Sequence, residues 1–396
     1  MLAASPGERL RTLRDLLGLT QEQLAAASGV KQSWISQVET SAREATEDGL
    51  RAIATTTGTP LRFFEVQSST VPLDSLRFRK LSSASKVMTR RVHALYSESY
   101  RLTESLLAAE NYPTPPLPYA TADTLTQGDI EELAHQTREA LRLAPDKPIP
   151  HLTRVLERAG VAIAPLVLTD DPEDAPAGGG HFGVSYWGGV ATPALIGYFS
   201  GSHGDRERFT LAHEVGHLVL HTFRPRADDP EGEANRFAGA LLVPRVRAES
   251  CISERKSLVE YARMKATWGV SIQALILRGA ALGLINDTRK RSLFVQLSAK
   301  GWRKNEPVVV GHEAPLLLWT LLSRHYGQQP YRPAAEDLAI HPTVLRSIAP
   351  TPAERSNKPT KLAMASVHQI TSEISNQVTA RPGRPDADPP LFPPDS

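Results

Sequence analysis

The chain has 396 residues, of which 41% are hydrophobic, so it is long enough to bury two or three separate cores. Its formal net charge of only +2 excludes a whole-protein field of the kind that attracts nucleic acid. The single cysteine, Cys251, excludes a disulfide framework and a cysteine-rich zinc finger, and it is typical of a reducing compartment. No stretch approaches the roughly 18 apolar residues of a spanning helix, and no signal peptide is recognisable. We therefore expect a soluble, cytoplasmic protein without a membrane partner.

Hydrophobic patterning predicts a mainly α-helical, multidomain chain with a small sheet in its central part. Proline-rich and polar segments separate five regions. These regions are an N-terminal all-α domain over residues 1–66, a linker and amphipathic helix over 67–125, an α+β domain over 126–307, a helical region over 308–350 and a disordered Pro-rich tail over 351–396.

Residues 1–66 show short, regular helix patterns. Thr20 is a good N-cap for a helix that begins at Gln21, and Gly29 supplies a tight turn before a second helix at about 32–39. We expect a small core between these two helices from Leu24, Ala25, Val30, Ile35 and Val38. The second helix is expected to leave five side chains facing outward, namely Gln32, Ser33, Trp34, Ser36 and Gln37.

Residues 9–64, from RLRTLRDLLGLTQEQ through KQSWISQVET to TPLRFF, resemble the XRE-type helix-turn-helix domain of phage repressors. The resemblance implies operator DNA as a partner, a homodimer, and the N-terminal half of the second helix in the major groove. Glutamine there can pair with the edge of adenine, and Gln21 would contact phosphate. Lys31 departs from the pattern, because a capping Ser or Thr is expected there. Residues 1–66 also hold seven basic and eight acidic side chains, which predicts weak nonspecific affinity, and a helical protein-interaction domain is the alternative.

Beyond the linker, periodicity predicts helices and three strands. The expected helices cover residues 76–110, 127–143, 148–159, 206–222 and 230–242, with two short ones over 255–285. One strand is expected over 161–168, and the segments FGVSYW and PALIGYF, separated by GGVAT, predict a hairpin.

The segment RFTLAHEVGHLVLH contains the pattern HExxH, with His213, Glu214 and His217. Residues four apart share one face of a helix, so the two imidazoles can reach a single Zn²⁺ at about 2.1 Å each. Glu214 is rotated away from the ligand pair, beside the metal rather than on it. A base must lie there to take a proton from an attacking water, so Glu214 is the predicted catalytic residue.

Catalytic zinc needs a third protein ligand and an open fourth position. The metzincin pattern is excluded, because Leu220 and Phe223 stand where it requires glycine and histidine. His221 lies roughly 12 Å from His213 along a straight helix, which is too far for both to share one ion.

The next predicted helix, EGEANRFAGALLVP, is the better source of the third ligand. Glu231 shares a face with small inward residues and is favoured, with Glu233 as its rival. Asn235, one turn after Glu231, is placed to hydrogen-bond a metal ligand from behind.

Several segments together are similar to the ImmA/IrrE family of metallopeptidases, over roughly residues 127–307. They are LRLAPDKPIPHLTRVLERAGV, RERFTLAHEVGHLVLH, EGEANRFAGALLVP, WGVSIQALILRGAALGLI and GWRKNEP. The resemblance implies a gluzincin-like fold, zinc ligands His213, His217 and Glu231, the general base Glu214 and endopeptidase activity. It also implies cleavage of DNA-binding repressors in stress and mobile-element responses. The segment WGVSIQALILRGAALGLI also resembles a helix-turn-helix, but the family resemblance assigns it to the scaffold of the peptidase domain.

Three functional hypotheses follow. The first is a DNA-binding transcriptional regulator fused to a zinc endopeptidase that cleaves a repressor-type protein or this chain itself. The second is a transcription factor whose zinc domain only senses or scaffolds, and the third is an antitoxin-like or prophage immunity regulator. Peptide cleavage also calls for an oxyanion donor. The sequence does not choose among four candidates for it, Tyr186, Tyr198, His181 and His203.

Overall fold

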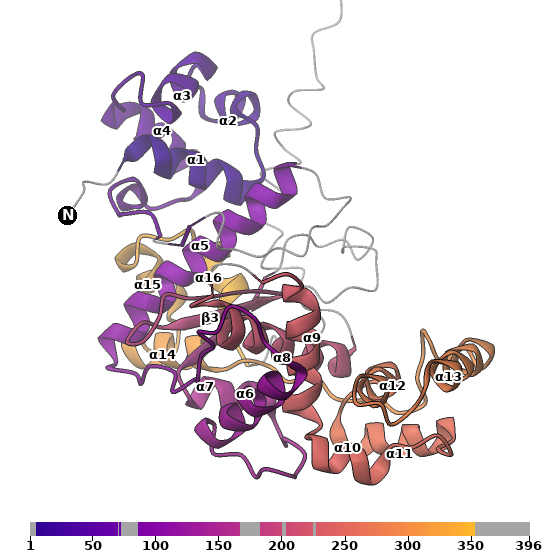
Figure 1. Ribbon diagram of the computed structural model, residues 1–396. Helices are drawn as coiled ribbons and strands as arrows, with labels where there is room; N and C mark the ends of the chain where they lie inside the picture. The colour runs from indigo at the N-terminus through magenta and orange to yellow at the C-terminus, as the bar shows by residue number, and fades with distance from the viewer. Residues whose placement is uncertain are drawn as a thin grey trace, which may run out of the picture.

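The computed structural model describes residues 5–69, 71–72, 86–166, 183–199, 203–224 and 227–352. Within these residues the chain is mainly helical with one three-stranded sheet, so the predicted fold class is confirmed (Figure 1). The predicted disordered tail, beyond its first two residues, and the start of the predicted 76–110 helix lie outside the described residues.

The N-terminal bundle contains α1 (Pro6–Leu17), α2 (Gln21–Ser28), α3 (Gln32–Glu39), α4 (Glu47–Thr57) and the short η1 (Leu61–Phe64). The Thr20 hydroxyl accepts from the backbone N–H of Gln23, whose side chain bonds back, and this capping box starts α2. α2 ends at Gly29, which adopts the left-handed conformation with φ of 71°. The predicted turn between the two helices is therefore formed by the expected residues.

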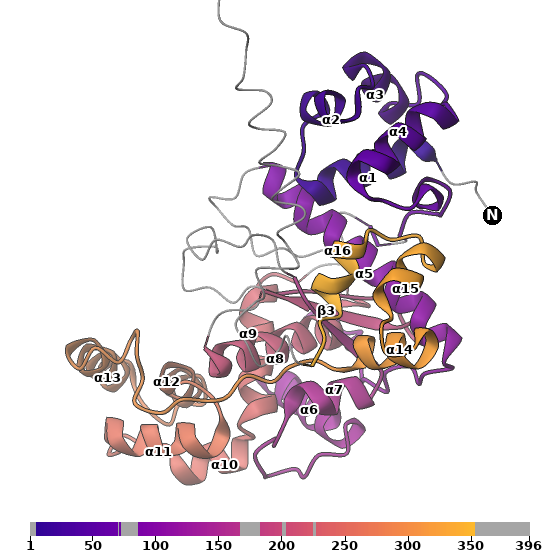
Figure 2. The same cartoon turned by 180° about the vertical axis from the view of Figure 1, so that it is seen from behind.

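Helix α5 (Lys86–Ala109) runs from the N-terminal bundle to the sheet (Figures 1 and 2). A fully buried ion pair joins it to α1, because the guanidinium of Arg9 faces the carboxylate of Glu98. The Nε of Arg9 also donates to the carbonyl of Phe63 at 2.9 Å. Arg101 contacts the same carboxylate and donates to the carbonyl of Leu338 at 2.9 Å. Glu98 therefore links three parts of the chain.

Acid is expected to weaken this junction through Glu98. Burial alone would raise its pKa, but the positive charges of Arg101 and Arg9 outweigh burial and lower the pKa from 4.5 to about 2. Because the folded-state pKa is depressed, its stabilisation is complete above the unfolded-state pKa and is lost as pH falls from about 4.5 towards 2. The shift corresponds to about 3 kcal/mol.

Denaturant titrations at several pH values between 6 and 2 measure this effect. Between the two limits the unfolding free energy of the wild type should fall by about 3 kcal/mol more than that of Glu98→Gln, which has no carboxyl to protonate. Parallel pH dependences of the two proteins would contradict the assignment.

The sheet consists of β1 (Val161–Pro165), β2 (Gly183–Trp187) and β3 (Ala194–Tyr198), in the order β1-β3-β2. β1 pairs with β3 in parallel, and β2 and β3 form the predicted antiparallel hairpin. Successive side chains alternate between the two faces. One face packs on α5 and the C-terminal helices through Ala162, Val184 and Leu195, and the other packs on the central helices through Val161, Ile163 and Ile196.

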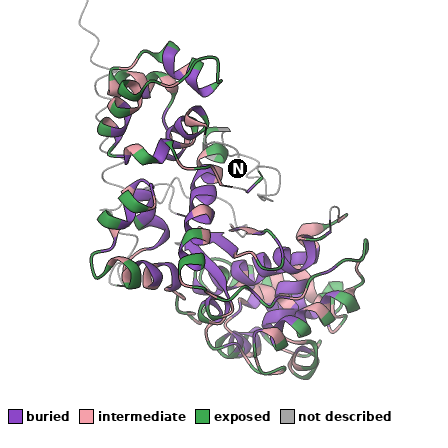
Figure 3. Cartoon of the chain, turned by 90° about the vertical axis from the view of Figure 1, so that its left-hand side faces the viewer, coloured by how far each residue is buried: buried purple, intermediate pink, exposed green. Residues whose placement is uncertain are grey.

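The central helices are α6 (Gln127–Ala140), α7 (Leu152–Arg158), α8 (Gly204–His221), α9 (Pro230–Leu242), α10 (Arg245–Cys251), α11 (Leu258–Trp268), α12 (Ile272–Ala281) and α13 (Asp287–Ala299). Helices α7 and α8 pack directly on that second face, α9 packs on α8, α6 packs on α9, and α10 to α13 extend away from the sheet (Figure 1). α8 lies between the sheet and α9, and every residue from Thr210 to His221 is buried. Buried positions fill the interiors of both parts of the molecule (Figure 3). α10 and α13 were not predicted from the sequence.

The predicted C-terminal helical region is formed by α14 (Leu317–Tyr326), α15 (Tyr331–Asp337) and α16 (Pro342–Ile348), beside α5 (Figure 2). The ring of His341, directly before α16, donates through Nε2 to the carbonyl of Thr57 at the end of α4, at 2.8 Å. The C-terminal helices therefore brace the N-terminal bundle. Among the described residues, no helix combines the length and the apolar character that crossing a membrane requires.

Candidate metal centre

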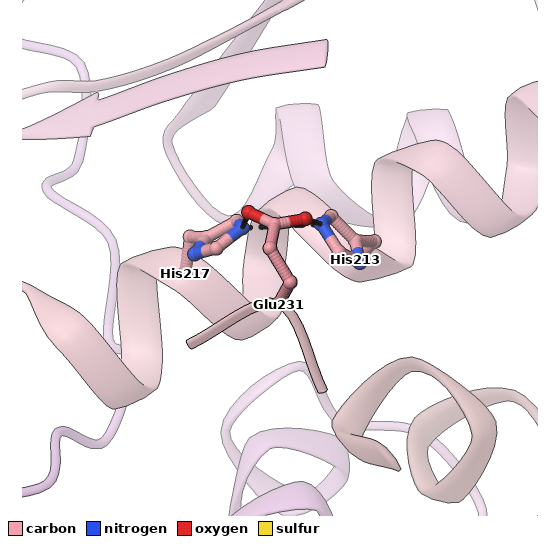
Figure 4. A group of neighbouring side chains, drawn as sticks. All are labelled: His213, His217 and Glu231. Carbon is pink, nitrogen blue, oxygen red and sulfur yellow. Dashed lines mark hydrogen bonds and ion pairs between the residues drawn. The ribbon is translucent and has the colours of Figure 1, made fainter. Parts of the chain in front are cut away.

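Two helices bring together three side chains of the types that bind metal ions (Figure 4). His213 and His217 lie one turn apart on α8, and their Nε2 atoms are 3.1 Å apart. Each Nε2 is 3.4 Å from a carboxylate oxygen of Glu231, in the first turn of α9. Donors of a tetrahedral zinc site with bonds of about 2.0–2.1 Å lie roughly 3.3–3.4 Å from one another. Each nitrogen and its nearest carboxylate oxygen are therefore spaced as in such a site, and one ligand atom from each of the three residues lies within 4.8 Å of the others.

A close crossing of the two helices makes this convergence possible. A Cβ on Gly216 would lie only 3.2 Å from the Cα of Ala234, so glycine lets α9 approach α8. α9 begins at this crossing because Asp229 caps it, accepting from the backbone N–H of Gly232 at 2.9 Å. Glu231 is thereby placed in the first turn, opposite the histidines.

Hydrogen bonds behind the histidines fix which ring nitrogens face the centre. The Nδ1 of His213 lies 3.0 Å from the Oδ1 of Asn235, an oxygen that can only accept, so this Nδ1 carries the proton. The Nδ1 of His217 lies 2.9 Å from the Nδ1 of His221, whose Nε2 lies 3.0 Å from the carboxylate of Glu233. The carboxylate also only accepts, so His221 donates to it through Nε2 and accepts from His217 through Nδ1.

In the neutral form, both histidines therefore turn an unprotonated Nε2 towards the centre. These two lone pairs and the carboxylate of Glu231 converge, which is repulsive unless a cation lies between them. Two imidazoles and one carboxylate are a donor set of catalytic zinc sites, so these residues fit the metal.

The structure separates the two rival acidic residues of α9. Glu233 turns away from the ligand pair and contacts His221 and the guanidinium of Arg224, at 2.7 Å from its Nη1. Burial alone would raise the pKa of Glu233, but the hydrogen bonds from Arg224 and His221 outweigh it and lower the pKa. Glu231, and not Glu233, joins His213 and His217 in this arrangement.

Glu214 is buried beside the ligands and contacts strand β2. The hydroxyl of Ser185 donates to its Oε2 at 2.6 Å, and Gly183 lies against the same carboxylate. The sequence reasoning missed both residues. Their alternation along β2 places them on one face of the strand, but nothing in the sequence indicates that this face meets Glu214.

Replacing Gly183 with alanine is expected to force β2 and Glu214 apart, because the new Cβ would lie 2.5 Å from Oε1 and 2.7 Å from Cγ of Glu214. Overpacking of this kind costs about 1–3 kcal/mol of unfolding free energy, which urea titration measures. Gly311→Ala is the matched control, because a Cβ there meets nothing within 4 Å. Equal stability of the two variants would contradict the close approach.

The candidate oxyanion donors lie at different positions in the structure. Tyr186 points to the opposite face of the sheet, where its ring lies 5.0 Å from that of Tyr100. His203 precedes the first turn of α8, ten residues before His213. Tyr198 is opposite Gly183 in the hairpin and faces α8. His181 lies outside the described residues.

In the N-terminal bundle, Gln32, Ser33 and Gln37 of α3 are exposed and Ser36 is half-buried. The expectation that Trp34 faces outward is wrong. Its indole is 7% exposed and belongs to the core, where it packs against Gly49 of α4, a residue whose Cβ would lie 2.7 Å from the ring.

A hydrogen-bonded chain orients the start of α3. Arg14 holds the buried carboxylate of Glu39 through Nε at 2.7 Å. Gln21 donates to the same carboxylate and accepts from the side-chain amide of Gln32, both at 2.9 Å. The side chain of Gln21 therefore supports Gln32, a role that the sequence reasoning did not foresee.

Comparison with known families agrees with this architecture. Residues 7–62 match a family described as a helix-turn-helix domain, and residues 183–278 match the IrrE N-terminal-like domain of a metallopeptidase family. The chain thus combines a DNA-binding domain with a peptidase-type domain. The family matches agree with the predicted combination of a helix-turn-helix domain and an ImmA/IrrE-type domain. No curated protein matches the chain.

Proposed function

We propose that this chain is a transcriptional regulator with a zinc-dependent endopeptidase domain, and that it cleaves a DNA-binding repressor-type protein or itself. The convergence of His213, His217 and Glu231 carries the proposal, because their outer hydrogen bonds leave three electron-rich atoms facing one another. The resemblance to the ImmA/IrrE family supports repressor-type substrates and a role in stress or mobile-element responses.

The residues around the ligands suit peptide hydrolysis. Zinc, when bound by the three ligands, would polarise a peptide carbonyl and lower the pKa of a nearby water. Glu214 would accept the proton of the attacking water and pass it to the leaving amine. Its bond from Ser185 would orient the carboxylate for this transfer, and its burial would strengthen the transfer by excluding bulk water.

The test combines metal analysis of the purified protein with a search for cleaved proteins in cells. Cells that produce the wild type should contain shortened proteins that are missing from cells producing Glu214→Gln, with about one zinc per chain in both variants. Identical protein profiles would leave the hydrolase proposal without support. Absence of zinc from the wild type would reject the metal centre itself.

The second part of the proposal is operator binding through α3. Gln32, Ser33, Ser36 and Gln37 would face the major groove.

 These four side chains would read base edges, and the hydrogen bond that Gln32 donates to Gln21 would hold Gln32 in a fixed orientation before DNA arrives. Trp34 is not part of the proposed contact surface, because its ring lies in the core. A homodimer on a two-fold symmetric operator belongs to the same proposal.

Replacing Gln32 and Gln37 with alanine is expected to weaken binding to the preferred sequence by about 1–3 kcal/mol for each base contact that is lost. The preferred sequence comes from selection of a random DNA library with the wild type, and titration against selected and scrambled duplexes gives the specificity ratio. Gln136→Ala, which changes an exposed glutamine of α6, is the matched control. An unchanged ratio in the double variant would contradict the assignment of α3.

A second function is favoured by one observation. The N-terminal bundle and one face of the sheet share a single apolar core, so a change at the metal centre has a packed route to the DNA-binding helices. This arrangement suits a transcription factor whose zinc domain senses the metal without cleaving a substrate. Zinc-dependent operator affinity that survives in Glu214→Gln, together with the absence of cleaved proteins, would favour this function.

A further inference from the structure

We propose that His221, Glu233 and Arg224 form a hydrogen-bonded relay that positions His217 as a zinc ligand, with His221 as the positioning residue. The proposal rests on the zinc site of the proposed function. It assigns a role to three residues that are not metal ligands themselves and that no part of the catalytic scheme uses.

The relay is continuous from His217 to Arg224, which lies just beyond the C-terminal end of α8. His217 donates through Nδ1 to the Nδ1 of His221 at 2.9 Å, and His221 donates through Nε2 to Glu233 at 3.0 Å. Arg224 then donates to the same carboxylate oxygen through Nη1 at 2.7 Å. Each of these bonds has a distance within the normal range for a hydrogen bond.

The outer end of the relay is anchored to the backbone. Arg224 donates through Nη2 to the carbonyl of Asp123 at 2.9 Å and through Nη1 to the carbonyl of Leu220 at 3.3 Å. The side chains of His221, Arg224 and Glu233 are only 2%, 2% and 8% exposed. A buried carboxylate is costly unless it is paired, so Arg224 keeps Glu233 ionised at this depth. The relay is therefore rigid and shielded from water.

The two ligand histidines are supported in different ways. His213 donates to the neutral amide oxygen of Asn235, whereas His217 donates to a histidine that is itself bonded to a carboxylate. A carboxylate behind a metal-bound imidazole raises its basicity and fixes its ring orientation. In this chain the carboxylate acts through an intervening imidazole, because His221 occupies the next turn of α8 and Glu233 lies beyond it.

Zinc affinity of the whole chain, measured by competition with a chromogenic chelator, tests the relay. His221→Leu removes both hydrogen bonds and is expected to weaken zinc binding by about 10–100-fold, the usual effect of losing a residue that supports a ligand. His221→Asn keeps a short acceptor beside His217 but does not reach Glu233, so it should lie between His221→Leu and the wild type. Glu233→Gln should also weaken binding, because it removes the charge from the relay.

The matched control is His312→Ala, which breaks a similar histidine–carboxylate contact, with Glu207 at 2.8 Å, away from the ligands. It should bind zinc as the wild type does. Circular dichroism and the unfolding midpoint of each metal-free variant identify any that fail to fold. The visible spectrum of the cobalt(II)-loaded protein adds a signature of ligand geometry, and we expect it to change in His221→Asn but not in His312→Ala.

The outcomes separate the relay from the proposed function. Wild-type zinc affinity and cobalt spectrum in folded His221→Asn and Glu233→Gln would overturn the relay while leaving the zinc site intact. A loss in His221→Leu as severe as in His217→Leu would also overturn it, because His221 would then be a ligand. Failure of the wild type to bind zinc would instead reject the metal centre on which the proposed function rests.

Discussion

Glu214→Gln is expected to lower kcat for cleavage of the protein substrate by about 10²–10⁴-fold, the usual contribution of a general base. The amide has nearly the same shape as the carboxylate and can still bond with Ser185, which lies 2.6 Å from Oε2 in the wild type. It cannot accept a proton from water at neutral pH. The ligand residues are unchanged, so zinc content should remain that of the wild type.

Single-turnover cleavage of a substrate identified from the cellular comparison measures this effect, with metal content determined on the same sample. Glu249→Gln, which changes a half-exposed carboxylate of α10 away from the ligands, is the control and should cleave normally. A fall in kcat accompanied by loss of zinc would show that Glu214 acts on the metal rather than on water. Wild-type cleavage would remove Glu214 from the catalytic role.

Glu231→Ala is expected to weaken zinc binding on the order of 10³-fold. Structural zinc sites with four ligands supply about 10–16 kcal/mol, so losing one ligand of three should cost roughly 4 kcal/mol, or three powers of ten. The structure places both oxygens of Glu231 at 3.4 Å from the ligand nitrogens, whereas Glu233 contacts His221 and Arg224. Chelator competition on the two alanine variants measures the difference.

Glu233→Ala should have the smaller effect on zinc affinity, because this residue supports a ligand without being one. Glu249→Ala is the control for loss of a carboxylate elsewhere and should leave zinc affinity unchanged. The reverse order, with Glu233→Ala losing more affinity than Glu231→Ala, would make Glu233 the third ligand.

The part of the site that follows from helical periodicity could be predicted from the sequence. His213 and His217 share a face because they are four residues apart, and Glu231 lies in the first turn of the next helix. The same periodicity extends to His221, so the sequence also indicates that three histidines share one face of α8. The contact between His221 and Glu233 was not predicted, because it depends on which face of α9 meets α8 where the two helices cross.

Sequence patterns did not predict the contacts between segments that are distant along the chain. Ser185 meets Glu214 across 29 residues of chain, through a strand that could have packed in several ways. Trp34 shares a helix face with Val38, so the apolar stripe of α3 is wider than predicted. The space that receives its ring exists because Gly49, on another helix, has no side chain.

The apolar cluster that joins α1, α5 and one face of the sheet has a consequence for how the molecule can be divided. Cutting the chain after residue 66 would expose Leu10, Leu13 and Leu17 to solvent, because residues beyond the cut help to bury them. It would also remove the ion pair between Arg9 and Glu98. Each half would then expose an apolar surface that promotes aggregation. The helix-turn-helix domain and the peptidase-type domain are thus expected to depend on each other for their solubility, and neither is expected to behave as an independent unit.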